Sequence, residues 1–462
     1  MRTPLPDRRS LWDLTAAAGL ASARFVSDAS GRVALAPGAA GSGPAPGIDM
    51  LRGRTVLISS DRQLPALLAL LMLDGIARRI LLCPPDLDPV HLPVIAAAAG
   101  VDIIVSDGTG PAVRAALDFP TLDCPTVVPP ADAEARRGET TEWLLFTSGT
   151  TGRPKIVVHT LATLSAPLDD GLAVSSSAIW STFYDVRRYG GLQILLRGLL
   201  GGGSLVLSQA SESVGDFLTR AGRSAVTHIS GTPSHWRRAL MSGGADRMAP
   251  RYVRLSGEPA DQAILNNLAH AWSNANVAHA FASTEAGVAF DVRDGKAGFP
   301  ATIIGRTGTP VEMRVVEGSL RIRSNRVALG YLGEGGALTD ADGFVDTGDM
   351  VELRGDRYFF VGRREGVINV GGQKVHPEEV EAVINQHPAV RIARVRGRRS
   401  PITGALVVAD IVIHPSGDFE TISGEVLQAC RNSLPPHKVP VMLRQVDRLD
   451  ITGSGKIVRS DA

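Results

Sequence analysis

Short runs of apolar, β-branched residues alternate with helical patterns through the first three hundred residues of this chain. The runs TVLIS, RILLC and DIIVS are separated by helical stretches over residues 64–76 and 89–99. The alternation returns later, as a helix over 192–200, the run SLVLS, a helix over 214–221 and the run AVTHIS. Such alternation is typical of parallel strands joined by crossover helices. The sequence therefore predicts a large domain of layered α/β sheets.

The pattern changes after residue 301, where short strands and turns such as EMRVV, SLRIR and RYFFVGR follow one another. A smaller block begins near residue 366 and combines strand-like runs over 392–396 and 406–413 with helices over 377–385 and 423–433. We expect a large N-terminal domain over 1–362, a hinge over 363–366 and a small, mobile α+β domain over 366–462. With 462 residues, the chain is long enough for two cores.

Charge and cysteine content exclude several classes of protein. The 48 lysines and arginines nearly balance the 47 acidic residues, so a basic field for nucleic acid is not expected. Cys83, Cys124 and Cys430 are far apart and match neither a disulfide framework nor a zinc site, which favours the cytoplasm. No signal-peptide core follows the N-terminal arginines, and the longest apolar run, 64–73, is too short to span a membrane.

A glycine-rich loop, TSGTTGRPK over residues 147–155, separates two strand-like runs. Gly149 and Gly152 permit positive backbone dihedrals, and Lys155 supplies a positive charge. The hydroxyl donors of the loop are Thr147, Ser148, Thr150 and Thr151. A polyanion would be bound well here, although the spacing differs from a Walker loop. Taken alone, the segment is equally consistent with a polar hairpin turn.

Four later segments remove this ambiguity: FASTEAG at 281–287, DTGD at 346–349, GRREGVINVGGQKVHPEEVE at 362–381 and TGSGKIVR at 452–459. Together with TSGTTGRPK, in this order, they resemble the adenylate-forming superfamily of acyl-CoA synthetases, amino-acid adenylation domains and luciferases. The resemblance covers the chain from about residue 50 to its end. It implies an enzyme that uses ATP and Mg²⁺ to activate a carboxylic acid as an acyl-AMP.

The resemblance also implies which residues hold the nucleotide. It assigns the β and γ phosphates to the loop residues Thr147, Ser148, Gly149, Thr150, Thr151, Gly152 and Lys155. In FASTEAG it implies that Phe281 stacks on adenine, that Ser283 lies at the nucleotide, that Thr284 contacts phosphate and that Glu285 holds Mg²⁺, which prefers oxygen ligands. This chain has Phe281-Ala282 where the family usually has Tyr-Gly, so stacking is retained but a hydroxyl is lost.

Three further roles follow from the later motifs. Asp349 matches the acid that binds both ribose hydroxyls, and Arg363 the basic residue beside it; a turn cap and a solvated arginine are the structural alternatives. Glu365 occupies the hinge position. Lys456 matches the lysine that contacts the α-phosphate and the carboxylate during adenylation. The glycine pair at 371–372 matches the loop that moves in for thioester formation.

The substrate region is where this chain departs from the family. Acyl-CoA synthetases commonly carry an aromatic–His pair before the Gly-Leu of this region, but here the run is FYDVRRYGGLQ, residues 183–193. Tyr184-Asp185 resembles the Phe-Asp pair of amino-acid adenylation domains, although its distance to the following LLGGGSLVL is longer. Asp185 beside Arg187 and Arg188 predicts either an internal ion pair or a polar receptor for the substrate, unless the arginines point to solvent.

Other candidate pocket residues follow from size and position. Gly190, Gly191 and Gly257 leave room for a flat ring that Tyr184 and Tyr189 could line. His228 and His279 belong to strands expected near the pocket, where a lone histidine is also often part of the core. These features favour an aryl or otherwise polar-substituted acid over an unbranched fatty acid.

The acceptor of the acyl group is open at this point. We expect transfer to CoA. The alternatives are a phosphopantetheine carrier, which would be a separate protein because the chain ends just after Lys456, and a non-thiol acceptor, either an amine in amide formation or nitrite in the diazotisation of an aryl amine. A nucleotide-binding regulator would have lost a catalytic group, whereas the expected ones are all present: Lys155, Glu285, Asp349, Arg363 and Lys456.

Overall fold

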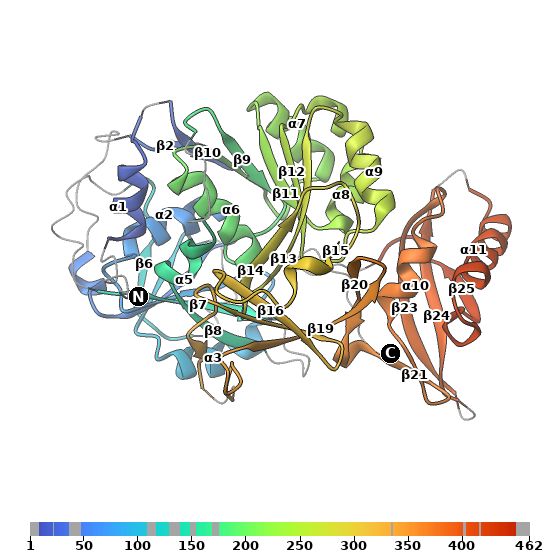
Figure 1. Ribbon diagram of the computed structural model, residues 1–462. Coiled ribbons are helices and arrows are strands. Elements are labelled where there is room, and N and C mark those ends of the chain that lie inside the picture. Colours follow the sequence, from blue (N-terminus) through green and yellow to red (C-terminus); the bar gives the residue numbers. More distant parts are fainter. Residues whose placement is uncertain are drawn as a thin grey trace.

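The computed structural model describes residues 9–21, 23–36, 48–108, 117–128, 139–147, 154–168, 175–333, 336–400, 403–414 and 417–449. Two large, mostly parallel sheets, which we call sheets A and B, form the N-terminal part together with a smaller antiparallel sheet C. A fourth sheet, D, belongs to the C-terminal part, coloured orange to red in Figure 1. The expected α/β fold with a small α+β domain is confirmed.

Sheet A has eight strands in the order β14-β13-β12-β11-β9-β10-β1-β2. Its strands are β1 (Phe25–Ser27), β2 (Arg32–Ala34), β9 (Ile179–Thr182), β10 (Ser204–Leu207), β11 (His228–Gly231), β12 (Tyr252–Ser256), β13 (Asn276–Ser283) and β14 (Gly287–Val292). All neighbours are parallel except the edge strands β2 and β14. One face is covered by helices α7 (Val214–Arg223), α8 (Pro233–Met241) and α9 (Gln262–Ala271), which share a core with it.

Sheet B has seven strands in the order β18-β8-β7-β4-β3-β5-β6. Its strands are β3 (Thr55–Ser59), β4 (Arg79–Leu82), β5 (Ile103–Ser106), β6 (Thr121–Asp123), β7 (Glu142–Thr147), β8 (Lys155–Thr160) and β18 (Gly330–Tyr331). Helix α3 (Leu92–Ala99) packs on its outer face. The two strands around the glycine-rich loop, β7 and β8, pair antiparallel, with Thr147 opposite Lys155.

Four helices fill the space between sheets A and B: α1 (Leu11–Ala17), α2 (Gln63–Leu73), α5 (Leu161–Ser165) and α6 (Tyr189–Leu200). Helix α2 is apolar on nearly every side, as expected for a helix enclosed by two sheets. Helix α6 differs because polar residues also point into this interior. Its N-terminal turn is tightly packed, since a Cβ at Gly191 would lie 2.1 Å from the Asp185 carbonyl oxygen.

Sheet C follows sheet A in the chain. Its strands, in chain order, are β15 (Phe299–Pro300), β16 (Val311–Val316), β17 (Ser319–Ser324), β19 (Val345–Arg354) and β20 (Arg357–Arg363). The C-terminal part contains β21 (Ile368–Val370), β22 (Gln373–Val375), α10 (Pro377–Ile384), β23 (Val390–Ser400), β24 (Gly404–Ile413), α11 (Phe419–Ser433) and β25 (Met442–Gln445). Short 3-10 helices are η1 (Ile48–Leu51), η2 (Pro89–His91), η4 (Ala166–Leu168), η5 (Ala245–Arg247), η6 (Ala301–Ile303), η7 (Arg364–Gly366) and η8 (Pro436–Lys438).

The two parts of the chain are in contact where sheet C meets helix α10. Arg354 Nη2 lies 3.4 Å from Glu379 Oε1, and a Cβ at Gly362 would come within 2.9 Å of the His376 side chain. The hinge that we propose at 363–366 covers η7, which lies between the last strand of sheet C and the first strand of sheet D. No helix of the described segments is long and apolar enough to cross a membrane.

Candidate active site

The loop predicted to hold phosphate connects the ends of β7 and β8. The structure places Thr147 and Lys155 opposite each other at these ends, which agrees with the expected strand–loop–strand arrangement. Ser148, Gly149, Thr150, Thr151 and Gly152 lie outside the described residues. Lys155 is exposed, and its Nζ lies 5.3 Å from the centre of the Tyr331 ring.

Glu285 is held in a tight turn directly after β13. The Ser283 hydroxyl accepts a hydrogen bond of 2.9 Å from the Ala286 amide, and the Glu285 carbonyl accepts one of 2.9 Å from Ala328. Gly287 then closes the turn at φ +78°, where a Cβ would lie 2.6 Å from the Arg326 side chain. Only glycine fits at this close approach. The turn therefore fixes the backbone of the FASTEAG motif.

Tyr331, which the sequence analysis did not identify, contacts the Glu285 side chain. Burial and the neighbouring carboxylate raise the pKa of Tyr331 to about 12, and its hydroxyl hydrogen-bonds to Glu285. Tyr331 is on β18, which pairs with β8 beside Lys155. The lysine after the glycine-rich loop and the glutamate of FASTEAG are thus brought to one place by a strand outside both motifs.

His159 is a second residue missing from the sequence prediction. Its Nε2 donates a 2.7 Å hydrogen bond to the Thr284 carbonyl, and its Nδ1 lies 2.9 Å from Thr163 Oγ1. Burial lowers its pKa to about 4, although the bond to Thr284 acts in the opposite direction. A neutral imidazole at neutral pH therefore positions the backbone next to Glu285. His159 is not part of any motif, because in the sequence it lies at the end of an apolar strand-like run.

Asp349 and Arg363 face each other on β19 and β20. Arg363 Nε lies 3.1 Å from Asp349 Oδ1, and the attraction of Asp349 is the main reason that the pKa of Arg363 is raised, with a further contribution from Glu285. Asp349 Oδ2 is buried and has no hydrogen-bond partner among the described residues. A buried carboxylate oxygen is normally satisfied, so this atom indicates a missing donor.

Phe281 lies in an aromatic cluster between sheets A and C. Its ring is nearly parallel to Phe360, at 5.0 Å between centres, and to Phe290, at 6.0 Å. Phe281 therefore makes the contacts of an ordinary core residue, and its role in adenine stacking stays a prediction.

Four of the predicted pocket residues come together near the carboxyl ends of the sheet A strands. The Tyr184 hydroxyl donates a 2.7 Å hydrogen bond to the Ser256 carbonyl, directly before Gly257, whose φ is +86°. A Cβ at Gly190 would be 3.6 Å from the Tyr184 ring. Tyr189, which precedes Gly190 in the sequence, is buried, and the centre of its ring lies 5.6 Å from the centre of the His159 ring. This group thus lies beside the Thr284–Glu285 turn.

The charged residues Asp185 and Arg188 are engaged elsewhere. Arg187 is 1% exposed and donates to Asp185 through Nε at 2.7 Å, and to the Ser60 carbonyl. Burial alone would raise the pKa of Asp185, but Arg187 more than offsets this and the net shift is downward. Arg188 pairs with Asp86. The internal ion pair is therefore the correct alternative, and the expectation of a substrate receptor at Asp185 and Arg188 has to be revised.

The two histidines are not brought into this group. His228 begins β11, at the strand end opposite to Gly257, and its ring stacks on Trp180 at 4.4 Å. His279 donates from Nε2 to the Lys296 carbonyl at 2.9 Å. Both histidines therefore have local partners, as the core alternative predicts.

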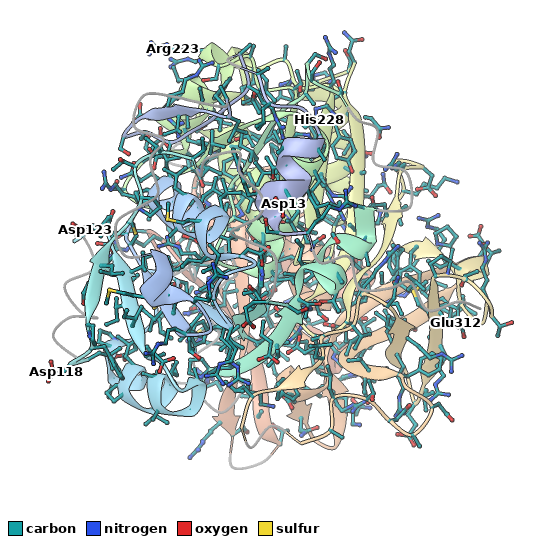
Figure 2. All side chains as sticks on the ribbon, turned by 90° about the vertical axis from the view of Figure 1, so that its left-hand side faces the viewer. Asp13, Asp118, Asp123, Arg223, His228 and Glu312 are labelled. Carbon is teal, nitrogen blue, oxygen red and sulfur yellow. The ribbon has the colours of Figure 1, made fainter. Side chains whose placement is uncertain are left out.

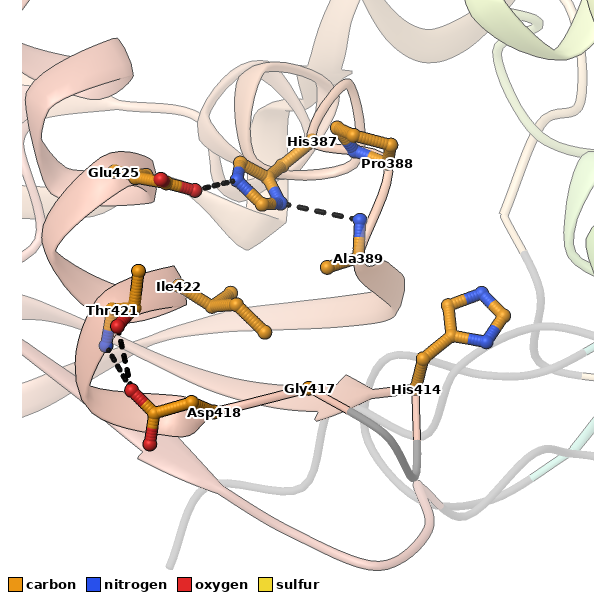
Figure 3. A pocket seen from close by; sticks show the side chains of 9 residues that line it. All are labelled: His387, Pro388, Ala389, His414, Gly417, Asp418, Thr421, Ile422 and Glu425. Atoms are coloured by element: carbon orange, nitrogen blue, oxygen red, sulfur yellow. Dashed lines mark hydrogen bonds and ion pairs between the residues drawn. The ribbon is translucent and has the colours of Figure 1, made fainter.

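The remaining predicted residues lie in or beyond the C-terminal region. Glu365 is exposed within η7, and Lys456 lies outside the described residues. A shallow hollow exists on the C-terminal part (Figure 3), where His387 Nε2 lies 2.8 Å from Glu425 Oε2. It is lined by His387, Pro388, Ala389, His414, Gly417, Asp418, Thr421, Ile422 and Glu425. None of these residues belongs to the five motifs, so this hollow is not the candidate site.

The amino-acid sequence matches a family model described as AMP-binding enzyme over residues 62–332 and one described as AMP-binding enzyme C-terminal domain over 379–456. The chain therefore belongs to the AMP-binding enzyme family, and it is an enzyme of the AMP-forming acid–CoA ligase type. The resemblance inferred from the five motifs is confirmed.

Relatives and solved structures agree with this assignment. A 2-succinylbenzoate–CoA ligase of Listeria innocua is 28% identical over 375 residues, which cover 78% of this chain and 77% of the relative. A feruloyl-CoA synthase of Amycolatopsis sp. is 28% identical over 345 residues, 69% of this chain and 68% of the relative. The structure of an anthranilate CoA ligase in complex with anthranoyl-AMP has a TM-score of 0.80 at 18% identity, and the match covers 98% and 96% of the two chains.

Proposed function

We propose that this enzyme activates an aryl or polar-substituted carboxylic acid as its acyl-AMP and transfers the acyl group to CoA. The observation that carries the proposal is the convergence of separate motifs on one place: Lys155 and Glu285 are joined through Tyr331, and Arg363 joins Glu285 to Asp349. The relatives named above act on aryl acids, which supports the same class of substrate here.

The chemistry needs such a convergence because two anions must meet. The carboxylate oxygen of the acid attacks the α-phosphorus of ATP, and the bond to pyrophosphate breaks. Lys155 and the hydroxyls of the glycine-rich loop would bind the departing pyrophosphate, and Lys456 would offset the charge shared by the carboxylate and the α-phosphate. The acyl-AMP would then react with the CoA thiol, releasing AMP, after the hinge at Glu365 has turned the C-terminal domain.

The residues present fit a nucleotide and a magnesium ion. Asp349 Oδ2 lacks a donor that a ribose hydroxyl would provide, and the Glu285 carboxylate is an oxygen ligand of the kind Mg²⁺ prefers. No cluster of three or more His, Cys, Asp or Glu in the described part of the chain could hold a metal by itself. Glu285 would therefore share the ion with phosphate oxygens and water, and Mg²⁺ bound there would neutralise charge on the phosphates.

Asp349→Asn should weaken the binding of AMP by about 10- to 100-fold, because the side chain loses the charge that strengthens a hydrogen bond from ribose. Isothermal titration calorimetry measures this directly. Asp342→Asn is a matched control, since Asp342 is an exposed aspartate in the turn before β19. Wild-type affinity in Asp349→Asn would show that Asp349 is not the ribose acceptor.

The acceptor is tested by supplying ATP, Mg²⁺ and a panel of aryl, amino-aryl and fatty acids together with CoA, and by following thioester formation by mass spectrometry. We expect an acyl-CoA from aryl or polar-substituted acids. Acylation of a phosphopantetheine carrier but not of CoA would replace the proposed acceptor by a carrier protein. Consumption of ATP that depends on an amine or nitrite would instead assign a non-thiol acceptor.

We also propose that this reaction takes place in the cytoplasm. The three cysteines Cys83, Cys124 and Cys430 are buried free thiols. Thiols of this kind persist in a reducing compartment, where disulfides are rare.

A further inference from the structure

Helix α6 carries a polar stripe between sheets A and B, which is buried at Tyr189 and Gln193 and partly buried at Arg197. Tyr189, Gln193 and Arg197 are spaced by four residues and so lie on one face of the helix. Gln193 donates from Nε2 to the Leu164 carbonyl at 2.9 Å, but its Oε1 is buried without a hydrogen-bond partner in the described part of the chain. The Nε of Arg197 is buried and unpaired in the same way, and Arg197 forms no ion pair with any residue that the structure describes.

The face of sheet A toward α6 also carries polar residues. Ser230 pairs with Arg254 in the ladder between β11 and β12, so their side chains stand next to each other on the same face of the sheet. Arg254 is 3% exposed and donates from Nη2 to Asp291 Oδ1 at 2.7 Å. Ser230 Oγ is buried without a partner among the described residues. Three polar groups with unmet hydrogen bonds thus line one interlayer region.

The charges in this region do not balance. Arg254 is paired with Asp291, and no carboxylate of the described segments forms an ion pair with Arg197. The pKa of Arg197 is lowered to about 10, mainly by burial and also by the neighbouring Arg254, while Asp291 acts in the opposite direction. Arg197 as a whole is partly buried, so its charge has lost part of its water without gaining a carboxylate partner among the described residues, which is unfavourable. The region is therefore suited to an added anion.

One end of the polar stripe lies near the Glu285 turn, and the other end lies further along helix α6. At its start, Tyr189 contacts His159, which holds the Thr284 carbonyl next to Glu285. Arg197 lies eight residues further along the helix, about 12 Å at the rise of an α-helix. The two ends of the stripe are therefore separated by roughly the length of an aromatic acid with a short side chain.

We propose that Arg197 is the counter-ion of a second anionic group on the acid substrate, at the end distal to the carboxylate that is adenylated. The substrate class is then a dicarboxylic acid with an aryl or similarly compact body. This inference rests on the proposed function, because it assigns the other end of the same substrate. It also assigns recognition of the substrate's polar group to the interior face of α6 rather than to Asp185 and Arg188, which form ion pairs within the protein.

The test compares matched acids that differ only in a second, distal carboxylate, using wild type, Arg197→Met and a control, Arg223→Met. Arg223 is an exposed arginine on α7, on the opposite face of sheet A and at the outer edge of the molecule in Figure 2. We expect wild type and the control to favour the dicarboxylate in kcat/KM for pyrophosphate release. Arg197→Met should lose about 10- to 100-fold of that preference, as expected for a charge-assisted hydrogen bond, with the KM for ATP unchanged.

Two further measurements separate the possible failures. The first is calorimetric binding of the dicarboxylate alone, which should be lost in Arg197→Met. If this loss is seen but no acid is adenylated by wild type, the proposed activity is refuted and the anion subsite is supported. The melting temperature of ligand-free Arg197→Met should be at least that of wild type, because the substitution removes a partly buried charge that has no carboxylate partner among the described residues. Equal use of mono- and dicarboxylates by wild type, or an unchanged preference in Arg197→Met, would overturn the proposal.

Discussion

The Lys456→Ala variant should bind ATP as tightly as wild type but form acyl-adenylate about 10²- to 10³-fold more slowly. The reason is that the charge shared by the carboxylate and the α-phosphate is greatest in the transition state, where one preorganised donor is worth a factor of this size. Lys456 lies outside the described residues, so this expectation rests on its position in the TGSGK motif. Single-turnover formation of acyl-AMP and calorimetric titration of ATP provide the two measurements.

Lys296→Ala is the appropriate control for this variant. Lys296 is an exposed lysine in the loop after β14. Its backbone amide donates to Asp294 and its backbone carbonyl accepts from His279 and Arg357, contacts that an alanine would keep. Its removal should leave both measurements unchanged. If Lys456→Ala formed adenylate at the wild-type rate, the assignment of Lys456 to the first half-reaction would be refuted.

Glu285→Gln should lower the rate of adenylation by at least about 10²-fold and raise the Mg²⁺ concentration needed for half-maximal rate. A neutral amide is a poor ligand for a hard cation, and the charge that Mg²⁺ offsets on the phosphates would be left unscreened. The substitution preserves the size of the side chain and its ability to accept from Tyr331. The turn around Ser283 and Gly287 should therefore remain folded, which thermal unfolding can confirm.

A surface glutamate gives the matched comparison. Glu352→Gln removes an exposed ion pair with Arg354, and exposed pairs contribute little to stability. This control should keep the wild-type Mg²⁺ dependence. An unchanged Mg²⁺ titration in Glu285→Gln would contradict the assignment of Glu285 as the metal ligand.

Local sequence patterns were sufficient for most of the fold. Helices α2, α6, α7 and α10 and the parallel strands β3, β4, β5, β10 and β11 were predicted from apolar, β-branched runs that alternate with helical patterns, because most of these apolar residues are also buried in the fold. The helix predicted over 89–99 begins instead as the 3-10 helix η2, since the proline at position 89 favours a tight first turn. The division of the strands into sheets A and B was not predictable, because it depends on contacts between distant segments.

The candidate site shows the same limit. Asp349, Arg363 and Glu285 were identified because their motifs are contiguous in the chain. His159 and Tyr331 were missed because each acts through a neighbour on another strand. The pocket was the least predictable part, since Asp185, Arg187 and Arg188 look like a receptor in the sequence and only the structure reveals their partners. Arg197 gave no signal, because a single arginine near the end of an apolar helix usually reaches solvent.

The central claim is that this site joins a carboxylic acid to AMP. Incubation of the enzyme with ATP, Mg²⁺ and aryl acids, without any acceptor, tests this most directly when the products are analysed by mass spectrometry and pyrophosphate release. We predict one acyl-AMP and one pyrophosphate for each acid activated. Failure to form an acyl-AMP from any acid of the panel, with ATP bound and Mg²⁺ saturating, would contradict it.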